Sequence, residues 1–221
     1  TLLGGAIALM LSLRPEIWWI EHFYDFLLYE NWSNALSSFG RVGIGGVGYE
    51  FNYHWFTYAW NGLISRLSRA DPWVATTRSS ILISVVFIQL LLSAIIKQYG
   101  VKNQIANLSA TIVAMFSTVA LWRGDSMRLL HLESFSGVFA LVWLLAVFLL
   151  VLKARESLSM RHFILIVVLC IATFGAKTAF GGVAVVLIFA LFIEALLNRR
   201  KDLKTYLLLF FVSLGSVLLL A

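Results

Sequence analysis

The sequence predicts an all-α, polytopic membrane protein: a bundle of about seven spanning helices, with an external loop of interfacial helices after the first span. Three observations lead to this class. Of the 221 residues, 61% are hydrophobic and only 13% are charged, whereas a soluble domain carries about 25% charged residues. The mean hydropathy is +0.89, and apolar runs of spanning length recur along the chain. These values exclude a disordered chain, a coiled coil and an ordinary water-soluble enzyme.

The apolar runs locate the spans, because a helix needs roughly 20 apolar residues to cross a bilayer. The run 1–13 stops at Arg14-Pro15 and is interpreted as the end of a first span. Because the sequence begins inside this apolar run and ends inside another, we expect it to be cut at both ends. The further expected spans are 79–96, 104–122, 134–152, 163–176, 178–197 and 205–221. Residues 1–221 thus form one transmembrane domain, with 14–78 as its external loop and 79–221 as its helical spans.

The loop charges predict the orientation, because cytoplasmic loops are enriched in Lys and Arg. One alternate set of short loops holds Lys97, Lys102, Lys153, Arg155, Arg161, Arg199, Arg200, Lys201 and Lys204. The other set holds Arg123, Arg128 and Lys177. We therefore expect the first set on the cytoplasmic side, and the segment 14–78 on the external side. The excess of 17 Lys+Arg over 11 Asp+Glu is then loop charge, and no nucleic-acid partner is expected.

The external segment 14–78 is rich in aromatic residues and holds six of the eight tryptophans. Trp and Tyr prefer the membrane–water interface, so we expect this segment to lie along the outer leaflet. Apolar residues at helical spacing predict two interfacial helices, over 21–39 and 53–67. The glycine-rich stretch 43–48 between them lacks the flanking strand and helix of a dinucleotide-binding motif and is interpreted as a loop.

The first interfacial helix carries a candidate acid–base site. Glu21, His22 and Asp25 share one face at the helical period. Partial burial at a membrane surface would make a carboxylate there a better proton acceptor near neutral pH. The alternative is a solvated polar face. A metal site formed by these three residues is a further alternative, but no strong metal-ligand motif is present and no metal ligand is predicted.

Other external residues are candidates for substrate binding. Tyr53 and His54 begin the second interfacial helix, where they either position a substrate or pack among aromatic rings. Arg123, Arg128 and His131 lie in the loop before the span 134–152. The arginines either clamp a phosphate or reach lipid headgroups.

Lys177 interrupts an apolar stretch on the external side, directly after the short span 163–176. An ionisable residue near membrane depth is a functional hypothesis by default, and short, glycine-interrupted apolar segments mark substrate sites in several transporter folds. The alternative is a loop lysine that reaches lipid headgroups. Glu194, near the cytoplasmic end of the span 178–197, is expected to be paired or to reach the interface.

Residues 20–73 resemble bacterial members of the GT-C superfamily, which are polytopic glycosyltransferases of lipid-linked sugars. The resemblance rests on three patterns: Asp25-(x)14-Gly40, Tyr53-His54-Trp55-(x)2-Tyr58-Ala59 and Leu67-(x)3-Asp71-Pro72. It implies that Asp25 is the catalytic base. Relatives often carry a second acidic residue or a His shortly after this Asp. Because Tyr29 and Glu30 stand nearby here, Asp25 either acts alone, pairs with Glu30, or is structural.

The resemblance also implies the partners. The donor would be a polyprenyl-phosphate sugar among the lipids of a bacterial inner membrane, and a glycan or protein acceptor would lie on the periplasmic side. Tyr53 and His54 would position the sugar or phosphate, and Lys177, Arg123 and Arg128 would stabilise the leaving phosphate. The requirement for a divalent cation is left open. The alternatives are a transporter or flippase of a lipid-linked sugar, and an assembly subunit without chemistry.

Overall fold

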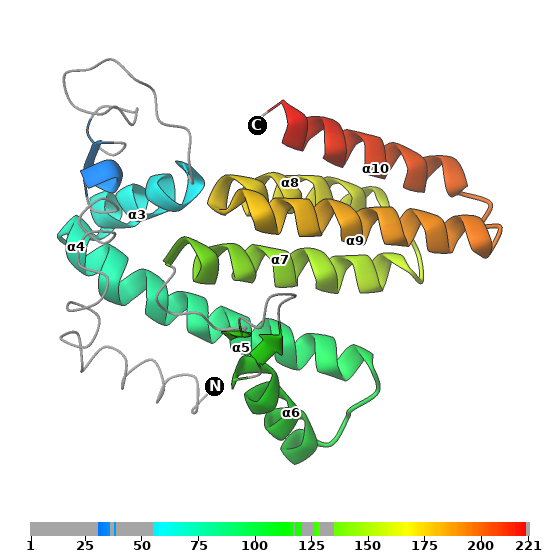
Figure 1. Cartoon of the computed structure of the whole chain (residues 1–221), viewed down its shortest axis with the longest axis horizontal. Helices are drawn as coiled ribbons and strands as arrows, with labels where there is room; N and C mark the ends of the chain where they lie inside the picture. Colours follow the sequence, from blue (N-terminus) through cyan, green and yellow to red (C-terminus); the bar gives the residue numbers. More distant parts are fainter. Residues whose placement is uncertain are drawn as a thin grey trace.

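Figure 1 shows the computed structural model of the chain. It describes residues 31–35, 38, 55–116, 118–120, 126–128 and 135–219. Helices predominate in these residues, and the one sheet found among them has two short strands. The predicted all-α class is therefore confirmed for the described part of the chain.

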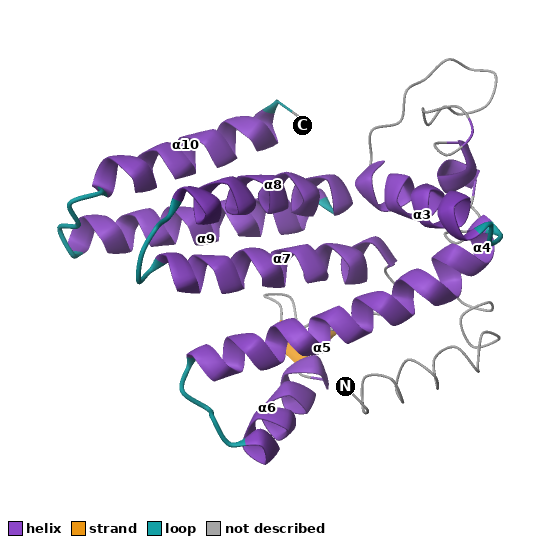
Figure 2. Ribbon diagram, turned by 180° about the vertical axis from the view of Figure 1, so that it is seen from behind, coloured by secondary structure: helices purple, strands orange, loops and turns teal. Residues whose placement is uncertain are grey.

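The predicted interfacial helices are partly within the described residues. Residues 31–35 and 38 are helical, in agreement with the helix predicted over 21–39. Helix α3 (Trp55–Ser68) corresponds closely to the helix predicted over 53–67. In Figures 1 and 2, α3 lies at one end of the bundle, beside the ends of α7 (Phe135–Ala154) and α8 (Met160–Ala176).

The next helix begins at Pro72, earlier than the expected start at residue 79. Three segments follow one another without a break: α4 (Pro72–Val74), the π-helical η1 (Ala75–Ser79) and α5 (Ser80–Gln98). Asp71 Oδ1 caps the start by accepting a hydrogen bond of 2.8 Å from Trp73 N. Pro72 suits the first helical position because it has no N–H to leave unpaired. Residues 72–78, predicted to lie in the external loop, are thus the first turns of this helix.

The expected span 104–122 is wrong in its last third. Helix α6 (Gln104–Phe116) ends early, and the strands β1 (Thr118–Ala120) and β2 (Ser126–Arg128) pair antiparallel, with Val119 opposite Met127. The β-branched pair Thr118-Val119 favours extended backbone, and an apolar run alone does not distinguish helix from strand. At 1.5 Å per residue, α6 is about 20 Å long, short of the roughly 30 Å hydrocarbon core.

The remaining helices agree with the prediction to within a few residues at their ends. They are α7, α8, α9 (Thr178–Leu197) and α10 (Leu203–Leu218). Helix α8 starts three residues before the expected position because Ser159 Oγ caps it, accepting from His162 N at 3.3 Å. Figures 1 and 2 show these four helices stacked side by side, with α5 crossing beneath α7.

Two apolar clusters hold the bundle together. In the first, Val85 and Ile88 of α5 pack against Val138 and Leu145 of α7. The second joins α7 to the three helices after it, and its fully buried side chains include Val147, Ile166, Ile188 and Leu209. Helix α7 belongs to both clusters and is therefore the central helix of the described bundle.

Three of the described helices are long and apolar enough to cross a membrane: Ser80–Gln98, Ser136–Ala154 and Thr178–Leu197. Their outward faces are also apolar, with exposed residues such as Phe87 on α5 and Val186 on α9. Polar side chains lie between helices instead, including buried Ser84, Gln89 and Ser213. This distribution is the reverse of a water-soluble surface.

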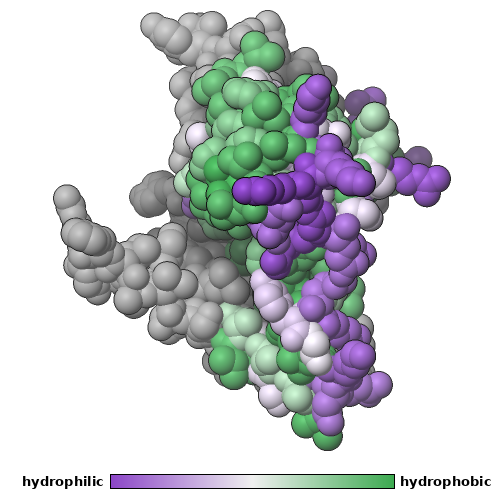
Figure 3. Space-filling view, turned by 90° about the vertical axis from the view of Figure 1, so that its right-hand side faces the viewer, coloured by the Kyte–Doolittle hydropathy of each residue, from purple (hydrophilic) through white to green (hydrophobic). Residues whose placement is uncertain are grey.

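Hydrophilic side chains gather at one end of the bundle. Figure 3 looks onto the end where α5, α7 and α9 finish, and a hydrophilic stripe runs along it beside a hydrophobic flank. This end contains the loops after the three long helices, in which the sequence places most of the lysines and arginines. The bundle therefore has a basic end, opposite the end at which α3 lies.

Candidate functional site

Most of the predicted site residues fall where the structure gives no description. These are Asp25, Glu30, Tyr53, His54, Arg123 and His131. Arg128 lies in β2, where its backbone is in register with Thr118. Lys177 is the predicted site residue whose surroundings are described, and the candidate site is therefore built around it.

Lys177 forms a one-residue connection between α8 and α9. Its backbone is extended, with φ −159° and ψ 117°. Its N–H donates to Thr173 O at 2.9 Å, while its carbonyl accepts from Phe180 N at 3.0 Å and Gly181 N at 3.1 Å. One residue thus ends one helix and begins the next, so the position of Lys177 is fixed by both.

Two glycines allow the close packing around this turn. A Cβ at Gly181 would lie 2.6 Å from Phe174 Cα, so α8 and α9 approach each other at a distance that a side chain would prevent. A Cβ at Gly175 would lie 3.0 Å from Phe56 Cβ and from ring atoms of Trp55. The second glycine therefore lets the first turn of α3 lie against the end of α8.

A buried hydrogen bond joins α3 to the same turn. Thr57 Oγ1 donates to Ala176 O at 3.3 Å, and Thr57 is fully buried. The last carbonyls of a helix have no partner within it, so a side chain from another helix stabilises this end. Because Thr57 lies in the first turn of α3, this hydrogen bond places that turn beside the one that holds Lys177. Helix α3 begins at Trp55, the residue that follows His54 in the sequence.

Helix α3 has its polar face inward. Thr57, Asn61 and Ser65 repeat every four residues and are all buried. Asn61 Oδ1 accepts from Ser80 Oγ at 2.6 Å, which connects α3 to the start of α5. By contrast, Leu63 is 49% exposed and Leu67 73% exposed. A helix with polar groups inside and leucines outside matches an apolar surrounding rather than water.

Aromatic rings fill the space between α3 and α7. Phe56 and Trp60 of α3 contact Phe139 and Trp143 of α7, with ring centroids between 5.7 and 6.4 Å apart. Edge-on and tilted pairs of this kind add roughly 0.5–1.5 kcal/mol each to the burial of their surfaces. The aromatic cluster and the hydrogen bond of Thr57 together fix α3 on the bundle.

The helical segment 31–35 also contacts α3. The ring of Trp32 meets Tyr58 edge-on, with centroids 4.8 Å apart. Tyr58 is fully buried, and so is Ser33. The segment that follows Glu30 in the sequence therefore packs on the same helix that borders the Lys177 turn.

The electrostatics of Lys177 follow from its partial burial. Desolvation disfavours the charged amine and lowers its pKa from the usual lysine value. A partly desolvated ammonium group interacts more strongly with an anion than one in bulk water does. Chemically, the turn can therefore bind a phosphate or stabilise negative charge that develops beside it. No cluster of three or more His, Cys, Asp or Glu side chains that could hold a metal occurs among the described residues.

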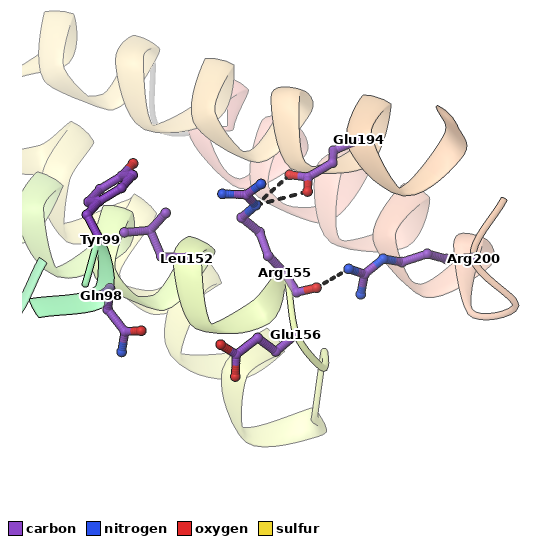
Figure 4. Close-up of a pocket in the computed structure, with 7 residues that line it drawn as sticks. All are labelled: Gln98, Tyr99, Leu152, Arg155, Glu156, Glu194 and Arg200. Carbon is purple, nitrogen blue, oxygen red and sulfur yellow. Dashed lines mark hydrogen bonds and ion pairs between the residues drawn. The ribbon is translucent and has the colours of Figure 1, made fainter. Parts of the chain in front are cut away.

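A polar pocket lies at the basic end of the bundle, and sequence reasoning did not predict it. Its volume is about 330 Å³, and Figure 4 shows its seven lining residues: Gln98, Tyr99, Leu152, Arg155, Glu156, Glu194 and Arg200. Arg155 Nε lies 2.8 Å from Glu194 Oε2, so Glu194 is paired, one of the two expectations for it. The loop charges predicted that these residues lie on the same side of the membrane. No local sequence pattern indicated that Arg155 and Glu194 contact each other.

No protein-family model matches the chain, and no curated protein and no solved structure matches it either. A function for this chain therefore has to rest on its own residues and their geometry.

Proposed function

We propose that the chain is a membrane-embedded glycosyltransferase of the GT-C type, which transfers a sugar from a polyprenyl-phosphate donor to an acceptor on the external side. Insertion into a membrane is supported by the three long apolar helices and by their exposed apolar faces. The inverted polarity of α3 supports a position at the membrane surface, with Leu63 and Leu67 toward lipid.

The observation that carries the proposal is the position of Lys177, partly buried at the end of the bundle where α3 packs. When the bond between a sugar and a lipid phosphate breaks, negative charge develops on the leaving phosphate. An ammonium group held beside the phosphate stabilises the transition state, in which this charge has developed, more than it stabilises the bound donor. It therefore lowers the barrier to transfer. A lipid-linked donor reaches such a group at the bilayer surface, without leaving the membrane.

The other roles are assigned by the resemblance. Asp25 would accept the proton of the acceptor hydroxyl, with Glu30 as helper or alternate base. Tyr53 and His54 would position the sugar or phosphate, Arg123 and Arg128 would help Lys177 to stabilise the leaving phosphate, and His131 would bind substrate. Two described contacts are compatible with these roles: Trp32 meets Tyr58 of α3, and α3 borders the Lys177 turn.

The test is a transfer assay with the purified chain in lipid vesicles, a donor with a labelled sugar on polyprenyl phosphate, and candidate acceptors. We expect Asp25→Asn to lower transfer by at least about 100-fold and Lys177→Met by about 100-fold to 1,000-fold. Lys177→Arg should retain more activity than Lys177→Met because it keeps the charge.

The matched control for Asp25→Asn is Asp202→Asn, an exposed position at the basic end of the bundle, which should leave transfer unchanged. Undiminished transfer by Asp25→Asn would remove this residue from the mechanism. Movement of the labelled donor across the vesicle membrane without a covalent product would support a flippase instead.

A further inference from the structure

The basic end of the bundle combines an excess of positive charge with a pocket. Its loops and helix ends hold the nine lysines and arginines that the sequence analysis expects on the cytoplasmic side, against the three acidic residues Glu156, Glu194 and Asp202. The difference, nine minus three, is six positive charges around one end. The electric field of these charges raises the local concentration of anions. The pocket lies at this end of the bundle and is lined by side chains that can donate hydrogen bonds to an anion.

Arg155 is the strongest donor in the pocket. Its Nε lies 2.9 Å from Glu194 Oε1 and 2.8 Å from Glu194 Oε2. The two terminal Nη groups have no hydrogen-bond partner among the described residues. Pairing through Nε therefore orients the guanidinium plane and leaves its outer pair of nitrogens available, the pair that binds a phosphate through two parallel hydrogen bonds.

The backbone that carries Arg155 is fixed by a second arginine. Arg200 donates through Nη2 to the carbonyl of Arg155 and through Nη1 to Tyr206 Oη at 3.1 Å. Tyr206 Oη in turn donates to Ala154 O at 2.9 Å. These bonds tie the end of α7 to the connection between α9 and α10 and to the start of α10, so the backbone on this side of the pocket is held in place.

A second donor lies on the Arg155 side of the pocket. Tyr99, directly after the end of α5, borders the pocket and offers a hydroxyl, whereas in Figure 4 the amide of Gln98 points to the side of Glu156. Glu194 is already paired. In Figure 4 the carboxylate of Glu156 and the guanidinium of Arg155 point to different sides, which leaves the Arg155 side of the pocket without a free carboxylate. The volume of about 330 Å³ is at the small end of ligand pockets, which span about 300–1,000 Å³.

We propose that this pocket binds a phosphate group, held by the Nη atoms of Arg155 with the Tyr99 hydroxyl beside them. The phosphate belongs either to an anionic phospholipid headgroup or to a soluble phosphoester, because the recognition chemistry is the same. The pocket lies at the end of the bundle opposite Lys177, so the proposal does not depend on glycosyl transfer.

The experiment has two arms, both with the purified chain in nanodiscs. In the first, nanodiscs of phosphatidylcholine are titrated with inorganic phosphate and with diphosphate at constant ionic strength, and binding is measured by calorimetry. In the second, nanodiscs contain increasing fractions of phosphatidylglycerol, and lipids that remain bound after release are counted by native mass spectrometry. Binding in the first arm identifies a soluble ligand, and binding in the second arm alone identifies a lipid.

Three variants distinguish the pocket from general attraction. Arg155→Lys keeps the charge beside Glu194 but loses the paired nitrogens, and should weaken binding at least about tenfold. Tyr99→Phe removes one hydroxyl from a side chain that is 64% exposed, so it should fold normally and weaken binding about threefold to tenfold. Lys201→Gln removes one charge at the same end outside the pocket and should change binding less than twofold in constant salt.

The proposal is overturned if neither arm shows saturable binding. It is also overturned if Arg155→Lys and Tyr99→Phe bind as wild type does, or if Lys201→Gln weakens binding as much as they do. In the last case the charge of the whole end, rather than the pocket, would attract the anion.

Discussion

Gly181 and Gly182 are neighbours in the first turns of α9 but differ in what a methyl group would meet. At Gly181 it would lie 2.6 Å from Phe174 Cα, whereas at Gly182 no heavy atom lies within 4 Å. Gly181→Ala should therefore destabilise the protein by about 1–3 kcal/mol through overpacking. Gly182→Ala should be neutral or stabilise it by up to about 1 kcal/mol, because alanine favours a helix more than glycine does. Unfolding curves in detergent micelles measure both, and equal effects would contradict the close approach of α8 and α9.

Lys177 should make stability depend on pH in the alkaline range. Its folded pKa is lowered by desolvation, so between that value and the unfolded value of about 10.4 the unfolded chain binds more protons. Stability contributed by this group therefore rises as pH increases through that window. Relative to Lys177→Met, the wild type should be least stable near pH 7 and should gain on the variant towards pH 10. A constant difference in melting temperature from pH 7 to pH 10 would show that the amine titrates normally in the folded state.

The attachment of α3 to the bundle depends on buried polar side chains, whereas a helix in water usually turns its polar side chains outward. Asn61 and Ser80 share a buried hydrogen bond of 2.6 Å between α3 and α5. In a double-mutant cycle, Asn61→Leu and Ser80→Ala should each destabilise the protein by about 1–3 kcal/mol, and their coupling should be about 0.5–1.5 kcal/mol. Strictly additive losses would mean that the two side chains do not interact in the folded protein.

The sequence predicted helices well where an apolar run and its ends agreed. The helix over 178–197 is found with those bounds, because Lys177 interrupts the run on one side and the cluster Arg199-Arg200-Lys201 ends it on the other. The span over 104–122 failed because its composition is apolar throughout, although its last part pairs as a strand. The start of the helix at Pro72 was missed because Asp71-Pro72 was interpreted only as part of a family pattern, not as a cap.

The sites were predictable to a lesser degree. Lys177 was found because a lysine in an apolar run is conspicuous in any sequence. The ion pair between Arg155 and Glu194 was not predicted, because the two residues are separated by 39 positions. They meet only when α7 and α9 pack together. The inward polar stripe of α3 also could not be predicted, since its direction is set by the helices around it and not by its own pattern.

At the scale of the whole molecule, the charges separate along the axis of the bundle. The nine lysines and arginines expected on the cytoplasmic side belong to the end where α5, α7 and α9 finish, and Lys177 lies at the other end, where Thr57 of α3 bonds to Ala176. The apolar faces between the two ends belong to helices such as Thr178–Leu197, whose 20 residues rise about 30 Å and match the hydrocarbon core. Both proposals place their ligands at these ends, one on each side of a membrane.

The most direct measurement of this arrangement is the accessibility of single cysteines in intact cells. The chain has one cysteine, the buried Cys170, so Cys170→Ala provides the background for Lys177→Cys and Lys201→Cys. A membrane-impermeant maleimide added outside should label residue 177 in intact cells and residue 201 only after the membrane is opened. Labelling of both positions from the same side would contradict a bundle that crosses the membrane with Lys177 outside and the basic end in the cytoplasm.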